Sequence, residues 1–325
     1  MRYIVRKVMF YGVALWAAVT LNFVLPRMMP GNPAEILLAR FKGRVNPAAI
    51  HAFLIAFGLN VHQTLFQQYV SYLGQLVRGN MGISITYYPE PVSQVLAQAL
   101  PWTLLLIGAA TIISFILGTL AGIVSAWHRG GWFDSVAPGV FTLTSSFPYF
   151  WFALLALYFF AYRAGWFPLG EAYSGTRASF AISNWPDLLY HTALPAFTIV
   201  FTSIGGWLLS MRNNMITTMG QDYILMARAK GLPRRRVMYQ YAARNAILPN
   251  MTGFALSLGF IVSGALLTEI VFSYPGLGYT LLQAVQNEDY PLMQGTLLLI
   301  AVAVLFANFV VDLLYVRLDP RVRNE

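Results

Sequence analysis

The stretch DYILMARAKGLPRRRVMYQYAARNAILP, residues 222–249, connects two uncharged apolar segments at 192–211 and 246–268. Its basic residues are Arg228, Lys230, Arg234, Arg235, Arg236 and Arg244. One arginine or lysine at the centre of a bilayer costs about 2.5–3.5 kcal/mol on insertion scales. The stretch must therefore lie in water, whereas the apolar segments on either side are long enough to cross a membrane.

The composition of the whole chain agrees with a membrane protein. Of its 325 residues, 58% are hydrophobic and 10% are charged, whereas soluble domains have about a quarter charged residues. The net charge of +9 could suggest nucleic acid, but the basic residues lie in short loops and at the ends of apolar segments, where membrane orientation explains them better. The absence of cysteine excludes disulfides, thiolate metal sites and cysteine nucleophiles.

Uncharged segments of membrane-spanning length predict an all-α integral membrane protein with six transmembrane helices. These segments are 8–26, 101–127, 135–162, 192–211, 246–268 and 290–311. The first follows a basic start and resembles a signal peptide. Its apolar run exceeds the usual length and no A-x-A site follows, so we predict a retained anchor.

The distribution of positive charge predicts the orientation. With six spans, the segments 1–7, 128–134, 212–244 and 312–325 share one side of the membrane, and together they hold fourteen lysines and arginines. The short opposite loops hold two, Arg163 and Arg177. The positive-inside rule therefore predicts that both termini and the basic loop are cytoplasmic.

The segment 27–100 is the other sizeable region outside the membrane. It opens with a turn cluster at 30–33 and closes with another at 79–82. Apolar residues recur at helical spacing within 67–77. We expect short extracytoplasmic helices packed on the outer face of the bundle, and no autonomous domain.

The sequence of the basic loop predicts two short helices separated by a glycine. Asp222 complements the positive end of a first helix, Gly231 fits a C′ position with positive φ, and Pro233 fits the first position of a second helix. That second helix must end before Pro249. On the first helix, Tyr223 and Met226 form an exposed apolar pair, and the small Ala227 and Ala229 leave room for a partner. An interfacial helix attracted to anionic lipid is an equal alternative from the residues alone.

The loop resembles the cytoplasmic loop of permease subunits of ABC importers, in the version typical of the dipeptide/oligopeptide (peptide/nickel-type) family. Further motifs occur in the family's order across nearly the whole chain. They are MPGNPAEILLA at 29–39, FGLN at 57–60, QYVSYLGQLVRGNMGISI at 68–85, ALPWTLLL at 99–106, SSFPYFWFALL at 145–155, WFPLG at 166–170, LLTEIVFSYPGLG at 266–278, DYPLMQG at 289–295 and VDLLYVRLDPRVR at 311–323. The general importer signature begins with Glu-Ala-Ala, whereas Leu225-Met226-Ala227 stands here, a departure that resembles the peptide subfamily.

The resemblance implies a type I ABC importer permease fold and a role for the loop. It divides the chain into an N-terminal anchor and extracytoplasmic region at 1–93, a permease core at 94–316 and a cytoplasmic tail at 317–325. The helix ending at Gly231 would be the coupling helix, which docks on an ATP-binding subunit. The positions that match this motif are Asp222, Tyr223, Ala227, Arg228, Ala229, Lys230, Gly231, Leu232, Arg244, Asn245 and Pro249. An external gate or turn would be formed by Glu269, Pro275, Gly276 and Gly278.

The function implied by the resemblance is half of a translocation pathway in the cytoplasmic membrane of a bacterium or archaeon. Peptides or similar small solutes would be delivered by an extracytoplasmic binding protein, with oligosaccharides, nickel and glutathione as alternatives. The other partners would be a second homologous permease chain, two subunits that bind ATP and Mg²⁺, and lipid. No nucleic acid, cofactor or metal is expected in this chain, which is a transport subunit and not an enzyme.

Two other classes are disfavoured by the sequence. A secondary transporter should show ionisable residues near the midplane, but the first four spans are uncharged, and Glu269 and Asp312 lie at the ends of the last two. For Glu269, its position and the resemblance favour a structural or gating role over substrate binding. An enzyme needs a catalytic constellation, but no G-x-S-x-G or P-loop occurs. The spacing of the four histidines matches no metal-binding motif, and they lie in different expected loops. They are His51, His62, His128 and His191.

Overall fold

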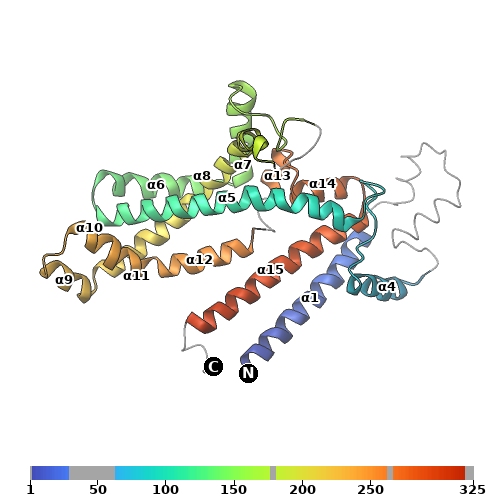
Figure 1. Cartoon of the computed structure of the whole chain (residues 1–325), viewed down its shortest axis with the longest axis horizontal. Coiled ribbons are helices and arrows are strands. Elements are labelled where there is room, and N and C mark those ends of the chain that lie inside the picture. Colours follow the sequence, from blue (N-terminus) through green and yellow to red (C-terminus); the bar gives the residue numbers. More distant parts are fainter. Residues whose placement is uncertain (1, 29–62, 176–180, 262–265, 319–325) are drawn as a thin grey trace. The chain divides into compact units, whose positions relative to one another are not determined.

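The computed structural model describes residues 2–28, 63–175, 181–261 and 266–318. In these ranges the chain is built from helices (Figure 1). It divides into two compact units. The terminal unit comprises Met1–Thr103 and Pro275–Glu325, and the central unit comprises Leu104–Tyr274. The expected turn at 30–33 and the rest of 29–62, part of the expected extracytoplasmic region, lie outside the described residues.

The terminal unit is built around two long helices that pack side by side (Figure 1). Its elements are α1 (Arg2–Met28), α4 (Leu65–Val77), the start of α5 (Val92–Trp127), α14 (Leu277–Gln286) and α15 (Tyr290–Leu318). Lys7 Nζ lies 2.6 Å from Asp312 Oδ2, and the Tyr11 hydroxyl donates to the same oxygen at 2.7 Å. These contacts bring the first turns of α1 to the last turns of α15, so both helices have their chain-terminal ends together.

The short helix α4 confirms the helix expected within 67–77. It begins with a capping box, in which the Thr64 hydroxyl accepts from the Gln67 amide and the Gln67 side chain accepts from the Thr64 amide. The turn expected at 79–82 is also present, since Gly79 and Gly82 have φ of 73° and 85°. Only glycine adopts such angles without strain.

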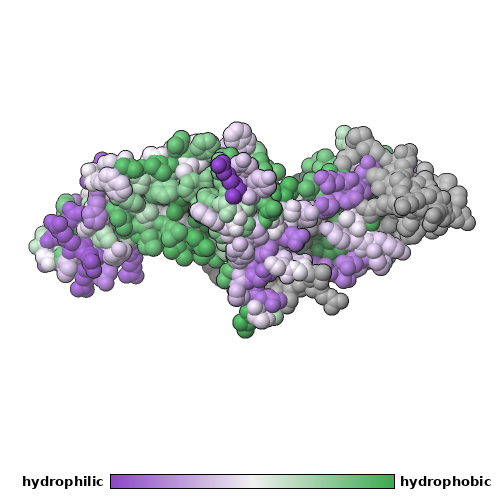
Figure 2. All heavy atoms as spheres, turned by 90° about the horizontal axis from the view of Figure 1, so that it is seen from above, coloured by the Kyte–Doolittle hydropathy of each residue, from purple (hydrophilic) through white to green (hydrophobic). Residues whose placement is uncertain are grey.

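The central unit contains the rest of α5 and the helices that follow it. These are α6 (Trp132–Ser146), α7 (Tyr149–Ala156), the π-helix η1 (Leu157–Arg163), the 3₁₀ turn η2 (Ile182–Asn184), α8 (Trp185–Met219), α9 (Asp222–Ala229), α10 (Arg234–Arg236), the π-helix η3 (Val237–Ala243), α11 (Arg244–Ala246), α12 (Leu248–Gly259) and α13 (Leu266–Val271). On the face shown in Figure 2, hydrophilic surface gathers at the end that carries α9 and α10, and the surface next to that end is largely apolar.

Four of the six expected spans appear as single helices. In the described residues, the helices long and apolar enough to cross a membrane are Arg6–Met28, Val92–Trp127, Ile182–Met219 and Tyr290–Val310. These contain the segments expected at 8–26, 101–127, 192–211 and 290–311, apart from the last residue of the fourth. The chain is therefore a helical membrane protein, as the composition predicts.

The other two expected spans differ from the prediction. The segment 135–162 is broken into α6 and α7–η1, which are bent by 94°. Phe147 is extended, with ψ of 137°, because a residue before proline avoids the α region. The segment 246–268 is divided between α12 and α13, with 262–265 outside the described residues. The prediction that each of these segments forms one continuous helix was wrong.

Three glycines set the spacing of α5, α6 and α8. A Cβ atom built on Gly122 would lie 2.6 Å from the carbonyl oxygen of Leu208, and one on Gly118 would lie 2.7 Å from that of Ile204. On the facing helix, a Cβ atom on Gly205 would collide with the carbonyl oxygen of Phe141. The pair Gly118 and Gly122 therefore permits close approach of α5, as the spacing predicts, and its partner is α8.

We predict that Gly122→Ala lowers the free energy of unfolding by about 1–3 kcal/mol, because the new methyl group meets backbone atoms that cannot turn away. Gly139→Ala on α6 is the matched control, since nothing lies within 4 Å of a Cβ atom there. Thermal unfolding in detergent, followed by loss of the monodisperse species, measures both. Equal midpoints would show that the α5–α8 contact tolerates a side chain.

Candidate functional site

The first half of the basic loop folds as the sequence predicts. Helix α9 begins at Asp222, whose carboxylate lies in the first turn, where it complements the helix dipole. The helix ends at Ala229, and Gly231 follows with φ of +72°. The Leu232 amide donates to the Ala227 carbonyl at 3.3 Å and closes the turn. The expected C-terminal glycine stop at Gly231 is confirmed.

The second half of the loop is helical, with two differences. Pro233 is the N-cap of α10, one position before the expected one. The helix then continues through η3 and α11 to Ala246, and so ends before Pro249 as expected. Pro249 instead lies in the first turn of α12. The π-helical turn of η3 was not predicted, because a π turn has no simple sequence signal.

The inner faces of both halves share one apolar core with the ends of α5 and α8. Its buried members are Ile123, Ala126, Met211, Met215, Ile224, Ala227, Val237, Met238, Ala242, Ala243 and Ala246. Ala227 is only 3% exposed. Our expectation that its small side chain leaves room for a partner was therefore wrong, since the side chain packs inward. The core fixes the loop firmly on two long helices.

The outer face of α9 is apolar and exposed. Leu225 is 55% and Met226 62% exposed, and Tyr223 is 39% exposed. The Tyr223 hydroxyl accepts a hydrogen bond from Asn245 Nδ2 at 3.0 Å, which brings together the two halves of the predicted motif. Ala229, Lys230, Arg244, Asn245 and Pro249 are also exposed. A small apolar patch surrounded by polar residues is a typical protein-docking surface.

A basic cavity of about 480 Å³ lies beside the turn at Gly231. Its lining residues are Trp127, Arg228, Gly231, Leu232, Arg234 and Val237. The guanidinium of Arg228 lies over the Trp127 ring, 5.6 Å from its centroid. In the described part of the chain, no carboxylate forms an ion pair with either arginine of the cavity. The cavity thus offers two positive charges to a carboxylate or phosphate group from another molecule.

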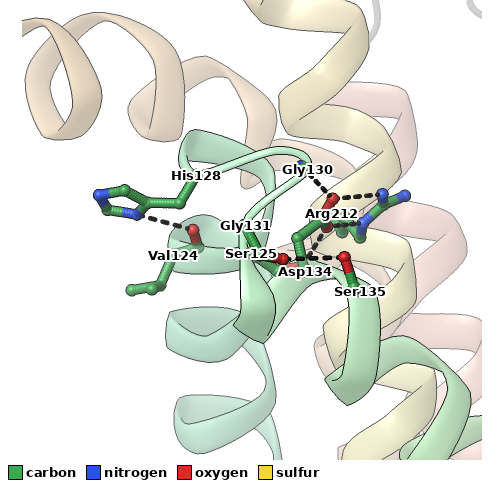
Figure 3. A network of polar contacts seen from close by, with 8 residues as sticks. All are labelled: Val124, Ser125, His128, Gly130, Gly131, Asp134, Ser135 and Arg212. Carbon is green, nitrogen blue, oxygen red and sulfur yellow. Dashed lines mark hydrogen bonds and ion pairs between the residues drawn. The ribbon is translucent and has the colours of Figure 1, made fainter.

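A partly buried ion pair connects the first turn of α6 to α8 (Figure 3). Arg212 Nε donates to Asp134 Oδ1 at 2.6 Å, and Arg212 Nη2 donates to Oδ2 at 3.1 Å. The Ser125 hydroxyl and the Gly130 amide donate to the same carboxylate at 2.7 and 3.0 Å. All four donors converge on a side chain that is 6% exposed. Arg212 was expected only as one of the loop charges, and Asp134, 78 positions away, was not predicted as its partner.

Removal of one partner of this ion pair should destabilise the central unit. Asp134→Asn leaves the partly exposed Arg212 charge without its carboxylate, and we expect a loss of about 1.5–3 kcal/mol in the free energy of unfolding. The double variant Asp134→Leu/Arg212→Met should recover much of that loss, because it removes both charges. A double-mutant cycle in detergent measures the coupling, and strict additivity would contradict it.

The residues expected at the external gate fall in different units. In the central unit, Glu269 lies in the first turn of α13 and is fully buried, and the Tyr274 amide donates to its carbonyl at 2.8 Å. In the terminal unit, Gly276 is the N-cap of α14, and Pro275 precedes it. Gly278 lies inside α14 and not in a turn, which differs from the expectation.

The chain is similar to one protein family and to several proteins named as peptide permeases. The sequence pattern of the family described as "Binding-protein-dependent transport system inner membrane component" matches residues 118–324, more than half of the chain. The chain is 36% identical to the di/tripeptide transport system permease protein DppB of Pseudomonas aeruginosa, over 97% of this chain and 95% of that protein. It is 32% identical to the oligopeptide transport system permease protein AppB of Bacillus subtilis, over 98% of each. Identity to the dipeptide permease DppB of Escherichia coli K12 is 33%, over 97% of this chain and 95% of that protein.

Proposed function

Because the chain belongs to the family of binding-protein-dependent transport system inner membrane components, we propose that it is a permease subunit of an ATP-driven peptide importer. The full-length similarity to permeases named for dipeptides, tripeptides and oligopeptides supports peptides over oligosaccharides, nickel or glutathione. The chain supplies part of the pathway, and the chemistry of ATP hydrolysis belongs to other subunits, which bind ATP and Mg²⁺.

The observation that carries this proposal is the exposed apolar face of α9 on a rigid base. In the proposed mechanism, Tyr223, Leu225 and Met226 dock on an ATP-binding subunit. Since the opposite face of α9 is packed on α5 and α8, a displacement of α9 by that subunit moves both long helices. Ala227 contributes through this packing, and Asp222 and Gly231 fix where the helix begins and ends.

The remaining coupling residues surround this face. They are Arg228, Ala229, Lys230, Leu232, Arg244, Asn245 and Pro249. Arg228 and Leu232 line the basic cavity, and an acidic side chain of the ATP-binding subunit fits its charge. The alternative, an interfacial helix on anionic lipid, would bury the same apolar patch in the membrane interface, and co-purification of the ATP-binding subunits distinguishes the two.

The proposed topology retains six spans, with both termini and the basic loop in the cytoplasm. The adjacent ends of α1 and α15 support a common side for the termini, and the excess of lysine and arginine supports the cytoplasmic side. In this proposal 1–93 is the anchor and extracytoplasmic region, 94–316 the permease core and 317–325 the tail. The family description supports the inner membrane of a bacterium.

The proposed assembly contains a second homologous permease chain, two ATP-binding subunits and an extracytoplasmic solute-binding protein. The binding protein delivers peptide to the outer face, where Glu269 and the segment that includes Pro275, Gly276 and Gly278 act as external gate elements. Burial of Glu269 supports a structural role in that gate over direct contact with substrate.

The coupling proposal predicts that Met226→Asp abolishes co-purification of the ATP-binding subunits and peptide-stimulated ATP hydrolysis. The side chain is 62% exposed, so the substitution should leave insertion and thermal stability unchanged. Met226→Leu is the conservative control and should retain both activities. Leu169→Asp, at an exposed apolar position outside the loop, controls for a general effect of added charge. Normal transport by Met226→Asp would rule out α9 as the coupling helix.

The substrate proposal is tested with the assembled transporter in proteoliposomes. We expect ATP-dependent uptake of a radiolabelled dipeptide in the presence of the cognate binding protein. Uptake of nickel or of an oligosaccharide, with no uptake of di-, tri- or oligopeptides, would contradict the peptide assignment and leave the permease assignment intact.

A further inference from the structure

The central unit contains a second cavity, an open groove of about 480 Å³, in the region between the expected membrane surfaces. It is lined from α5, the α6–α7 break, α8 and the end of α12. The lining residues are Ile107, Thr111, Ser145, Phe147, Pro148, Tyr149, Ile199, Thr202, Ser203, Ser257, Phe260 and Ile261. The groove carries five hydroxyl side chains from the serines and threonines among them and no charged residue.

The backbone of one wall is irregular, which indicates contact with water. The chain leaves the helix at Phe147 and Pro148 and turns by 94° before α7. Phe147 is 47% and Tyr149 38% exposed. Non-helical backbone at membrane depth is tolerated only where it is buried in protein or lines a water-filled cavity. Since this break is not buried in the central unit, we assign it to the wall of an aqueous space.

Three of the five hydroxyl groups donate to carbonyl groups of their own helices. Ser145 donates to the Phe141 carbonyl at 2.8 Å, and Ser257 donates to the Phe254 carbonyl at 2.8 Å. Thr202 donates to the Thr198 carbonyl at 3.0 Å. A hydroxyl has one proton and two acceptor lone pairs. With the proton directed to the same helix, each of these oxygens offers acceptor capacity to a molecule in the groove.

We infer that this groove is a substrate-contacting part of the pathway, in which Ser145, Thr202 and Ser257 accept hydrogen bonds from backbone N–H groups of the passing peptide. This inference rests on the proposed function. All peptides have backbone N–H groups except at proline, whereas their side chains differ in charge. A wall of neutral acceptors contacts the backbone N–H groups that peptides share. Because the wall carries no charge, peptides with acidic side chains and peptides with basic side chains interact with it about equally.

Other occupants make poorer use of the same groove. Lipid acyl chains have no donors, so they would leave the hydroxyl oxygens without partners. A helix of the second permease chain has its backbone N–H groups bonded within that helix. A solute with free N–H donors is the occupant that matches the acceptor chemistry of the wall.

The absence of cysteine from the chain provides a direct test of water access. Single-cysteine variants are placed in the transporter, assembled with its ATP-binding subunits, in lipid nanodiscs. We expect a hydrophilic methanethiosulfonate reagent to modify Thr202→Cys several-fold faster than Ile113→Cys, an exposed position on α5 outside the groove. Addition of dialanine, the binding protein and ATP should slow the reaction at Thr202→Cys only.

A second experiment tests the acceptor role of the hydroxyl. Thr202→Val keeps the shape of the side chain and removes its oxygen. Transport of dialanine is compared with that of its depsipeptide analogue, in which an ester replaces the amide N–H. With saturated binding protein, the turnover ratio of amide to ester should change about three- to tenfold, the effect of one neutral hydrogen bond. Thr142→Val is the matched control, because Thr142 also donates to its own helix but lies outside the groove.

The outcomes separate this inference from the proposed function. Uptake of dialanine or of a longer peptide by the unaltered transporter tests the function itself, and the absence of uptake of every peptide would overturn both. With uptake present, the groove assignment alone is overturned if Thr202→Cys is no more reactive than Ile113→Cys, as a covering helix or lipid would cause. The acceptor role is overturned if Thr202→Val and Thr142→Val give the same amide-to-ester ratio as the unaltered protein.

Discussion

The close contact between α5 and α8 is the constraint on which the rest of the central unit depends. Gly118 and Gly122 allow the two backbones to approach to a distance that no side chain would permit. In a membrane, where lipid tails are as apolar as side chains, such packing and buried polar contacts replace the hydrophobic effect between helices. The paired helices form one support, with the apolar core of the basic loop at one end and the hydroxyl-lined groove along its length.

The packing of these helices matters for the proposed mechanism, in which a displacement of the loop by an ATP-binding subunit must reach the groove. The core that contains Ile224 and Ala227 packs the loop on α5 and α8, and the Asp134–Arg212 pair ties the first turn of α6 to α8 just before the loop begins. Both connections lie at the loop end of α8, and Thr202 of the groove lies farther along the same helix. In the proposed mechanism, a movement of α9 would thus be transmitted by packed helices and not by a flexible linker.

The sequence predicted those features that depend on local chemistry, and failed where tertiary contacts decide. Uncharged length identified the single-helix spans, and Gly231 identified the end of α9. Proline alone did not identify the break, because Pro138 and Pro195 lie inside α6 and α8 whereas Pro148 ends a helix. The orientation of Ala227 was also ambiguous, since the sequence of α9 is apolar on several sides. Asp134 and Arg212 are too distant in sequence for any local pattern to pair them.

The basic loop carries several charges, whereas the groove is lined by no charged residue. The different surroundings of the two regions explain this difference. The basic residues at the loop tolerate full hydration and, in the proposed assembly, would add electrostatic attraction to the ATP-binding subunit. The same charges in the groove would be costly to bury in the membrane and would bind peptides of opposite charge too tightly for release. Hydroxyl groups avoid both effects, because their protons bond to their own helices and their oxygens form weak, neutral contacts. A pathway that accepts varied peptides is better served by such contacts than by any single strong one.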